Sequence, residues 1–117
     1  TLIFTTALPP LNVAWTEFIV KRLPDMNERR KRLATLSEQL RTALKKKGYA
    51  CPSESHIVPM LVGASKETVL KAEELQRKGF YVLPVRPPTV PEGTSRLRFS
   101  LTATLSSGEL EQLIDVL

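Results

Sequence analysis

An apolar stripe in the middle of the 117-residue chain constrains the fold more than any other feature. Its members recur at the three- and four-residue spacing of one helix face: Leu33, Leu36, Leu40, Ala43 and Leu44. This spacing predicts a long helix over 27–47 that Asp25 or Asn27 caps and Gly48 ends. Since a single apolar stripe stabilises a helix only when it is packed, the rest of the chain must cover it.

The remaining segments predict what the long helix packs against. Residues 2–6 predict a short strand or an extended segment, and residues 11–22 predict a helix. A strand is predicted over 56–62, where Pro59 indicates an edge or a bulge. A helix capped by Ser65 and ended by Gly79, a strand over 80–85, a stiff proline loop over 86–95, a strand over 96–101 and a helix over 106–117 follow. The fold class predicted is α+β, a small, mostly antiparallel sheet with helices packed on one face.

The net charge of +5 raises the question of a nucleic-acid partner. Eight lysines and arginines lie between Arg29 and Lys47, largely outside the apolar stripe of the long helix. Aromatic residues make up only 6% and do not alternate with the basic ones. We therefore favour a solvated helix face and expect no nucleic acid, while a basic nucleic-acid-binding or structural module stays open as the alternative of another class.

Other site types find little support in the residues. One cysteine and one histidine cannot build a zinc site alone, so no metal site is expected. Cys51 and His56 are close in sequence, but nothing nearby orients the imidazole, and we interpret Cys51 as a packed thiol. A lone cysteine fits a reducing compartment. No apolar run approaches the roughly 20 residues that span a bilayer, so no membrane partner is expected.

Two places suggest an anion site. The strand over 96–101 alternates, so that Leu97, Phe99 and Leu101 face one way and Arg96, Arg98 and Ser100 the other. An arginine held on a strand suits a carboxylate or a phosphate, which it binds through two parallel hydrogen bonds. The hydroxyls of Thr5 and Thr6, just before Pro9, can also donate to an anion. The residues alone leave open whether either place is a site or ordinary strand chemistry.

The amino-acid sequences of three segments resemble those of one enzyme family. Residues 86–103, RPPTVPEGTSRLRFSLTA, resemble the C-terminal signature of the 8-amino-7-oxononanoate synthase branch of the α-oxoamine synthases, pyridoxal-phosphate enzymes of the aspartate-aminotransferase fold. Residues 3–10, IFTTALPP, and 55–63, SHIVPMLVG, resemble two earlier segments of the same family in the same order. The resemblance covers essentially the whole chain and implies the small C-terminal domain of a fold-type I enzyme.

The resemblance implies a role for several residues. Thr5 and Thr6 match a hydroxyl pair that reaches the cofactor phosphate of the neighbouring subunit, Arg98 matches the arginine that holds the amino-acid carboxylate, and Thr89 matches a residue that contacts substrate or product. Arg96 matches no role. The family's cofactor lysine lies upstream of these segments, so the resemblance implies no catalytic residue in this chain, and Lys66 is interpreted as a surface residue.

The implied reaction condenses a pimeloyl-type thioester with alanine, with loss of carbon dioxide, in biotin biosynthesis. Sister enzymes are the near alternative: glycine C-acetyltransferase, 5-aminolevulinate synthase and serine palmitoyltransferase. Residues 1–24 are expected to be the end of the large domain and its connecting helix, and residues 25–117 the small domain. The parent enzyme is expected to be a cytoplasmic homodimer that binds pyridoxal phosphate, whereas this chain alone is expected to be inactive and free of cofactor.

Overall fold

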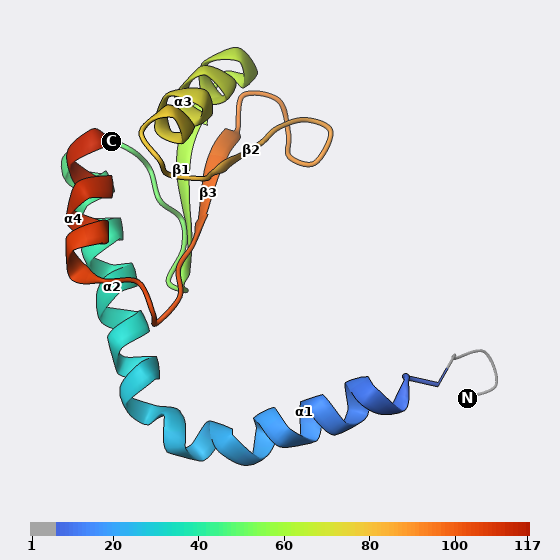
Figure 1. Cartoon of the computed structure of the whole chain (residues 1–117). Helices are drawn as coiled ribbons and strands as arrows, with labels where there is room; N and C mark the ends of the chain where they lie inside the picture. The colour runs from blue at the N-terminus through green and yellow to red at the C-terminus, as the bar shows by residue number, and fades with distance from the viewer. Residues whose placement is uncertain (1–6) are drawn as a thin grey trace.

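The computed structural model of the chain describes residues 7–117 and has the α+β architecture that the sequence predicts (Figure 1). The elements, in chain order, are α1 (Pro10–Arg22), the 3-10 turn η1 (Leu23–Met26), α2 (Asn27–Lys46), β1 (Ile57–Gly63), α3 (Ser65–Arg77), β2 (Leu83–Val85), β3 (Ser95–Ser100) and α4 (Ser107–Val116). The strand predicted over 2–6 lies outside the described residues.

The sheet has three antiparallel strands in the order β1-β3-β2, so β3 is central. Val58 lies opposite Phe99 and Met60 opposite Leu97, and all four side chains are buried. They form one core with the inner faces of the helices, whose buried members are Leu36, Leu40, Leu44, Ala72, Leu75, Leu110 and Leu113. The expectation of helices on one face of the sheet is therefore confirmed. Pro59 lies on an edge strand, as its missing N–H predicts.

The predicted stripe of α2 faces this core. Leu40 and Leu44 are fully buried, and α2 packs against both α4 and β1. Gly48 follows the helix with a φ of 87°, a conformation that glycine adopts without strain. The helix therefore lies close to its predicted bounds, because the glycine that ends it and the leucines that are buried both match the sequence pattern.

Two predicted helix caps are wrong. Met26 is the N-cap of α2, because η1 carries the chain into the helix and neither Asp25 nor Asn27 caps it. Ala64 is the N-cap of α3, and Ser65 lies inside the helix. The Ser65 hydroxyl instead shares a 3.1 Å hydrogen bond with that of Ser95, which is fully buried and needs a partner. A buried hydroxyl far away in sequence has thus taken the place of the local cap.

The strand predicted over 80–85 is shorter in the structure and covers only Leu83–Val85. The Phe80 N–H donates to the Leu75 carbonyl at 2.9 Å, which completes the end of α3. The Gln76 side chain donates to the Val82 carbonyl at 2.7 Å. Since these backbone groups are already used, the first half of the segment does not join the sheet.

Helix α1 forms where it is predicted, but none of its side chains is buried against the described part of the chain. Trp15 is 62% exposed and stacks on Phe18, with ring centroids 5.5 Å apart. Figure 1 shows α1 as an arm that leads away from the sheet and the other helices. The radius of gyration is 17.7 Å, against about 13 Å for a compact domain of this length. The chain is therefore a packed body with an extended N-terminal arm.

Candidate functional site

The uncovered face of the sheet is the place where the predicted arginines meet. Strand alternation turns Leu97 and Phe99 into the core and leaves Arg96, Arg98 and Ser100 on the opposite side. The cross-strand neighbours on this side come from both edge strands and are apolar: Ile57, Pro59 and Leu61 of β1, and Leu83 and Val85 of β2. We call these eight residues the open face.

Arg98 is the exposed arginine of the open face. It lies opposite Pro59 on one side and Leu83 on the other. Within residues 7–117 its guanidinium has no hydrogen-bond or ion-pair partner, so all of its donors can bind a ligand. Because β3 is hydrogen-bonded on both sides, the backbone beneath Arg98 is held in place, as a fixed carboxylate-binding group requires.

Arg96 differs from Arg98 in its surroundings. It is half-buried between Leu61 and Val85, and its Nε donates to the Thr94 carbonyl at 3.0 Å. The residues alone do not distinguish the two arginines, but the structure does. The Arg96 guanidinium is anchored to the loop before β3, whereas the Arg98 guanidinium has no hydrogen-bond partner among residues 7–117.

Thr89 belongs to the loop over 86–94, which joins β2 to β3. Its N–H donates to the Arg86 carbonyl at 3.0 Å, and the residue is exposed. The hydroxyl makes no hydrogen bond within the described part of the chain. Thr89 and Arg98 thus come from the loop and the strand of a single hairpin, and no contact joins them.

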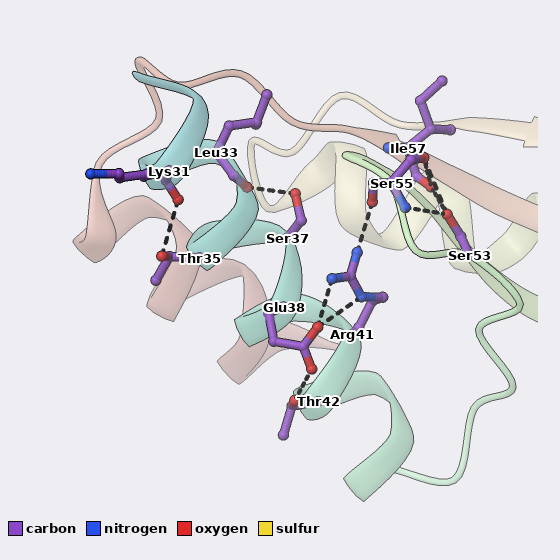
Figure 2. Close-up of polar contacts among 10 residues, drawn as sticks. All are labelled: Lys31, Leu33, Thr35, Ser37, Glu38, Arg41, Thr42, Ser53, Ser55 and Ile57. Carbon is purple, nitrogen blue, oxygen red and sulfur yellow. Dashed lines mark hydrogen bonds and ion pairs between the residues drawn. The ribbon is translucent and has the colours of Figure 1, made fainter. Parts of the chain in front are cut away.

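The turn that leads into β1 is held partly by Arg41, which the sequence pattern assigns only to the basic face of a helix. Arg41 donates to the Ser55 carbonyl at 2.8 Å and forms a 2.6 Å ion pair with Glu38 (Figure 2). The hydrogen bond and the positive charge of Arg41 lower the pKa of Glu38 below its ordinary 4.5. The Ser53 hydroxyl donates to the Ile57 carbonyl at 2.6 Å.

Since Ile57 begins the strand that flanks β3, these contacts position one border of the open face. The three-residue spacing of Glu38 and Arg41 on a predicted helix was the available signal for the ion pair. Nothing in the sequence pointed from Arg41 to Ser55, because the second contact depends on how the turn folds back over α2.

The hollows of the surface do not enclose the arginine pair. One hollow of about 200 Å³ is lined by Arg98 together with Tyr81, Ser100 and Glu109 among others. A larger one of about 820 Å³ runs along α2, beside Thr35, Glu38 and Lys46, and contains neither arginine of β3 nor Thr89. The larger hollow also carries cationic side chains, but its arginine, Arg41, is already paired with Glu38 and with the Ser55 carbonyl. We therefore place the candidate site on the open face, where Arg98 has no such partner within residues 7–117.

The other predicted site residues and alternatives are placed as follows. Thr5 and Thr6 lie outside the described residues. Lys66 is exposed, as interpreted. Burial raises the pKa of the Cys51 thiol above its ordinary 9.0, which agrees with a packed residue. Within residues 7–117, no group of histidine, cysteine and acidic side chains could hold a metal ion. None of the helices described over the same residues is long and apolar enough to cross a membrane.

Comparison with known proteins extends these observations. The family model of class I and II aminotransferases matches residues 1–117. The chain is 51% identical over 114 residues to the 8-amino-7-oxononanoate synthase of Haemophilus ducreyi, covering 97% of this chain and 30% of that protein. The chain spans about 30% of the length of the curated relatives that it matches.

Two solved structures share the fold. The serine palmitoyltransferase of Sphingomonas wittichii is 30% identical, with a TM-score of 0.85 over 97% of this chain and 29% of that protein. The 8-amino-7-oxononanoate synthase of Francisella tularensis is 24% identical, with a TM-score of 0.79 over 97% of this chain and 33% of that protein. At this lower identity the second likeness concerns the fold alone.

Proposed function

This chain belongs to the class I and II aminotransferase family, and we propose that it is the C-terminal part of a pyridoxal-phosphate-dependent α-oxoamine synthase. The observation that carries the proposal is Arg98, an arginine on the central strand of the sheet that has no ion-pair or hydrogen-bond partner within the described residues. Such a group suits an amino-acid substrate, whose carboxylate can accept two parallel hydrogen bonds from it. Holding that carboxylate fixes the orientation of the substrate's reacting bonds.

The described residues fit the substrate better than they fit the cofactor. No described group forms a phosphate cradle, and the residues proposed to reach the cofactor phosphate are Thr5 and Thr6. The cofactor, when bound in the whole enzyme, supplies an electron sink for the carbanion. The contribution proposed for this chain is to bind and orient the amino acid through Arg98, with Thr89 contacting substrate or product.

We propose alanine and a pimeloyl-type thioester as substrates, condensed with loss of carbon dioxide in biotin biosynthesis. Support comes from relatives named 8-amino-7-oxononanoate synthase, which are about 50% identical. The second candidate is a sister enzyme that takes another amino acid, and the likeness to serine palmitoyltransferase favours it. The lower identity of 30% makes this the weaker candidate.

The proposal also concerns domains and assembly. Residues 1–24 are assigned to the end of the large domain and its connecting helix, and residues 25–117 to the small domain. Support comes from α1, whose apolar side chains no other described element covers. The whole enzyme is proposed to be a cytoplasmic homodimer, in which Thr5 and Thr6 reach the cofactor of the neighbouring subunit.

The test uses the holoenzyme that this chain completes, made by joining it to the preceding part of the Haemophilus ducreyi relative. We expect decarboxylative condensation with alanine and a pimeloyl thioester. Replacing Arg98 by alanine removes charge-assisted hydrogen bonds of about 1.5–3 kcal/mol each. The KM for alanine should therefore rise at least about tenfold, while the cofactor absorbance stays unchanged.

Arg29 supplies the matched control, since it is also an exposed arginine but lies on α2. Arg29→Ala should leave the KM for alanine as it is. An unchanged KM in the Arg98→Ala enzyme would refute the proposed role. Comparing alanine with serine and glycine, each with the same acyl thioester, separates the two candidate functions, because the preferred amino acid differs between the sister enzymes.

A further inference from the structure

Arg96 is the charged residue of the open face to which the proposed function assigns no role. It lies two residues before Arg98 on the same side of β3, so their Cα atoms are about 6.6 Å apart along the strand. The residues of the open face include no acidic side chain. The two arginines therefore present a pair of positive charges among apolar neighbours.

The anchoring of Arg96 leaves its outer end available. The Thr94 carbonyl accepts from Nε at 3.0 Å, and Thr94 is itself held by the Pro91 carbonyl, which accepts from the Thr94 N–H at 3.2 Å and from its hydroxyl at 2.7 Å. Within residues 7–117 the two terminal nitrogens of Arg96 have no hydrogen-bond or ion-pair partner. A guanidinium fixed at its base loses little conformational entropy when its outer end binds an anion.

The surroundings of Arg96 favour binding of an anion over mere solvation. Leu61 and Val85 flank it on the two edge strands, and the residue is half-buried. Apolar neighbours reduce the screening of the charge by water and strengthen its attraction for an anion. The same neighbours offer a surface for methylene groups. Thr89, which is proposed to contact substrate or product, belongs to the loop that anchors Arg96.

We propose that Arg96 binds a second anionic group, carried by the acyl donor, while Arg98 holds the carboxylate of the amino acid. This inference rests on the proposed function, because it places a second substrate on the same face. The shared chemistry is a carboxylate or phosphate that accepts two hydrogen bonds from the outer end of the guanidinium. The group has two possible sources, the far end of the acyl chain and the thiol carrier, and the experiment distinguishes them.

The experiment uses the holoenzyme described above with Arg96→Gln, whose amide keeps part of the shape and loses the charge. The KM for the pimeloyl thioester should rise at least about tenfold, whereas the KM for alanine stays within about twofold. Arg96→Lys keeps the charge without the planar fork and should recover part of the affinity. Cofactor absorbance and the thermal unfolding midpoint report whether each variant is folded.

Two further acyl donors identify the anion. If a thioester whose chain ends in a methyl group abolishes the difference between the unchanged enzyme and the Arg96→Gln variant, the anion is the terminal carboxylate. If a phosphate-free thiol carrier abolishes it, the anion is the carrier's phosphate. Either result supports the proposal. An equal rise of the KM with every donor, or no rise with any, overturns it.

The failure of this inference can be told apart from failure of the proposed function. The role of Arg98 is measured by the KM for the amino acid, and that of Arg96 by the KM for the acyl donor. If the holoenzyme catalyses no condensation, the proposed function fails, and NMR of the 117-residue chain titrated with pimelate then tests Arg96 separately. A second titration with inorganic phosphate tests the other source of the anion. With one of the two anions the Nε–H signal of Arg96 should shift more than that of the exposed Arg77, and equal shifts with both anions contradict the inference.

Discussion

At the scale of single residues, Glu109 is an acidic side chain whose ionised form is held by local contacts. Its carboxylate accepts from the Ser106 N–H at 2.8 Å and from the Ser106 hydroxyl at 2.7 Å. The contact from the Ser106 N–H has the larger effect and that from the hydroxyl the smaller, and both lower the pKa of Glu109 below its ordinary 4.5. The Ser106 hydroxyl in turn accepts from the Glu109 N–H at 3.2 Å. Together with the contact from the Ser106 N–H, this forms the capping box that begins α4, as the spacing of the two residues predicts.

We expect Glu109 to make the stability of the chain depend on acid. Because its pKa is lower in the folded state than in the unfolded one, its contribution is present above about pH 4.5 and is lost as the pH falls further. Urea unfolding of the chain at pH 7 and about pH 3.5 measures this loss. Glu109→Gln should reduce the difference between the two free energies of unfolding. Glu111→Gln, on the same helix, serves as the control, and equal behaviour of the two variants would contradict the prediction.

At the scale of elements, Gly79 determines how α3 ends. Its φ of 90° lies in the left-handed region, and a Cβ added there would meet no atom within 4 Å. Any effect of adding a methyl group therefore comes from the backbone and not from crowding. Its N–H also donates to the Gln76 carbonyl at 3.0 Å, within the turn that closes the helix.

Gly79→Ala should destabilise the chain by about 1 kcal/mol. Gly108→Ala is the matched control, because Gly108 lies in α4 without a positive φ and also has open space around it. That variant should be neutral or slightly more stable, since alanine favours helix. Free energies of unfolding in urea check both. A Gly79→Ala chain as stable as the unchanged one would show that the turn adapts.

The arm formed by α1 has a different relation to stability. Trp15 stacks on Phe18, and the Arg22 guanidinium lies 4.0 Å from the centre of the Phe18 ring, but neither ring is buried. Within the described residues, α1 packs mainly against η1. The arm therefore adds apolar surface without adding to the core.

Replacing Trp15 by glutamine should change the free energy of unfolding of the chain by less than about 0.5 kcal/mol. In the holoenzyme, where α1 is proposed to connect to the large domain, the same variant should lower the thermal unfolding midpoint. Leu113→Gln is the contrasting variant, because this side chain of α4 is buried and its replacement should destabilise both forms. Loss of stability in the isolated chain with Trp15→Gln would show that the arm is packed.

At the scale of the whole molecule, the chain presents one open face and one extended arm. Among the elements described over residues 7–117, the helices cover one side of the sheet, and the arginines of β3 lie on the other. We propose that this open face, with its two arginines, makes up one wall of a substrate site. The opposite wall is proposed to be the part of the enzyme to which the chain's relatives devote the rest of their length.

The isolated chain should therefore bind pyridoxal phosphate weakly at most. Because the lysine that carries the cofactor is proposed to lie upstream of this chain, mixing the two should give no cofactor absorbance that survives dialysis. The holoenzyme of the chain and the preceding part of the relative should retain the absorbance. A stable cofactor band from the chain alone would contradict the proposal that this part lacks the covalent step.

Much of the fold follows from local patterns. Leu36, Leu40 and Leu44 lie in the core because their spacing forms one face, and Leu97 and Phe99 do so because a strand alternates. Two of the errors occurred where a side-chain hydrogen bond competed with the local pattern. Ser65 hydrogen-bonds the buried Ser95 in place of capping α3, and Gln76 occupies the carbonyl of Val82 and shortens β2.

The candidate site was also predicted from the sequence only in part. The sequence alone predicts that the two arginines share a face of one strand, because side-chain direction alternates with a period of two along any strand. Three other features come from the folded chain: this face is left uncovered, Thr94 anchors Arg96 while Arg98 is free, and Arg41 holds the turn before β1. These contacts depend on which segments meet in space, and that depends on packing of the whole chain and not on any local pattern.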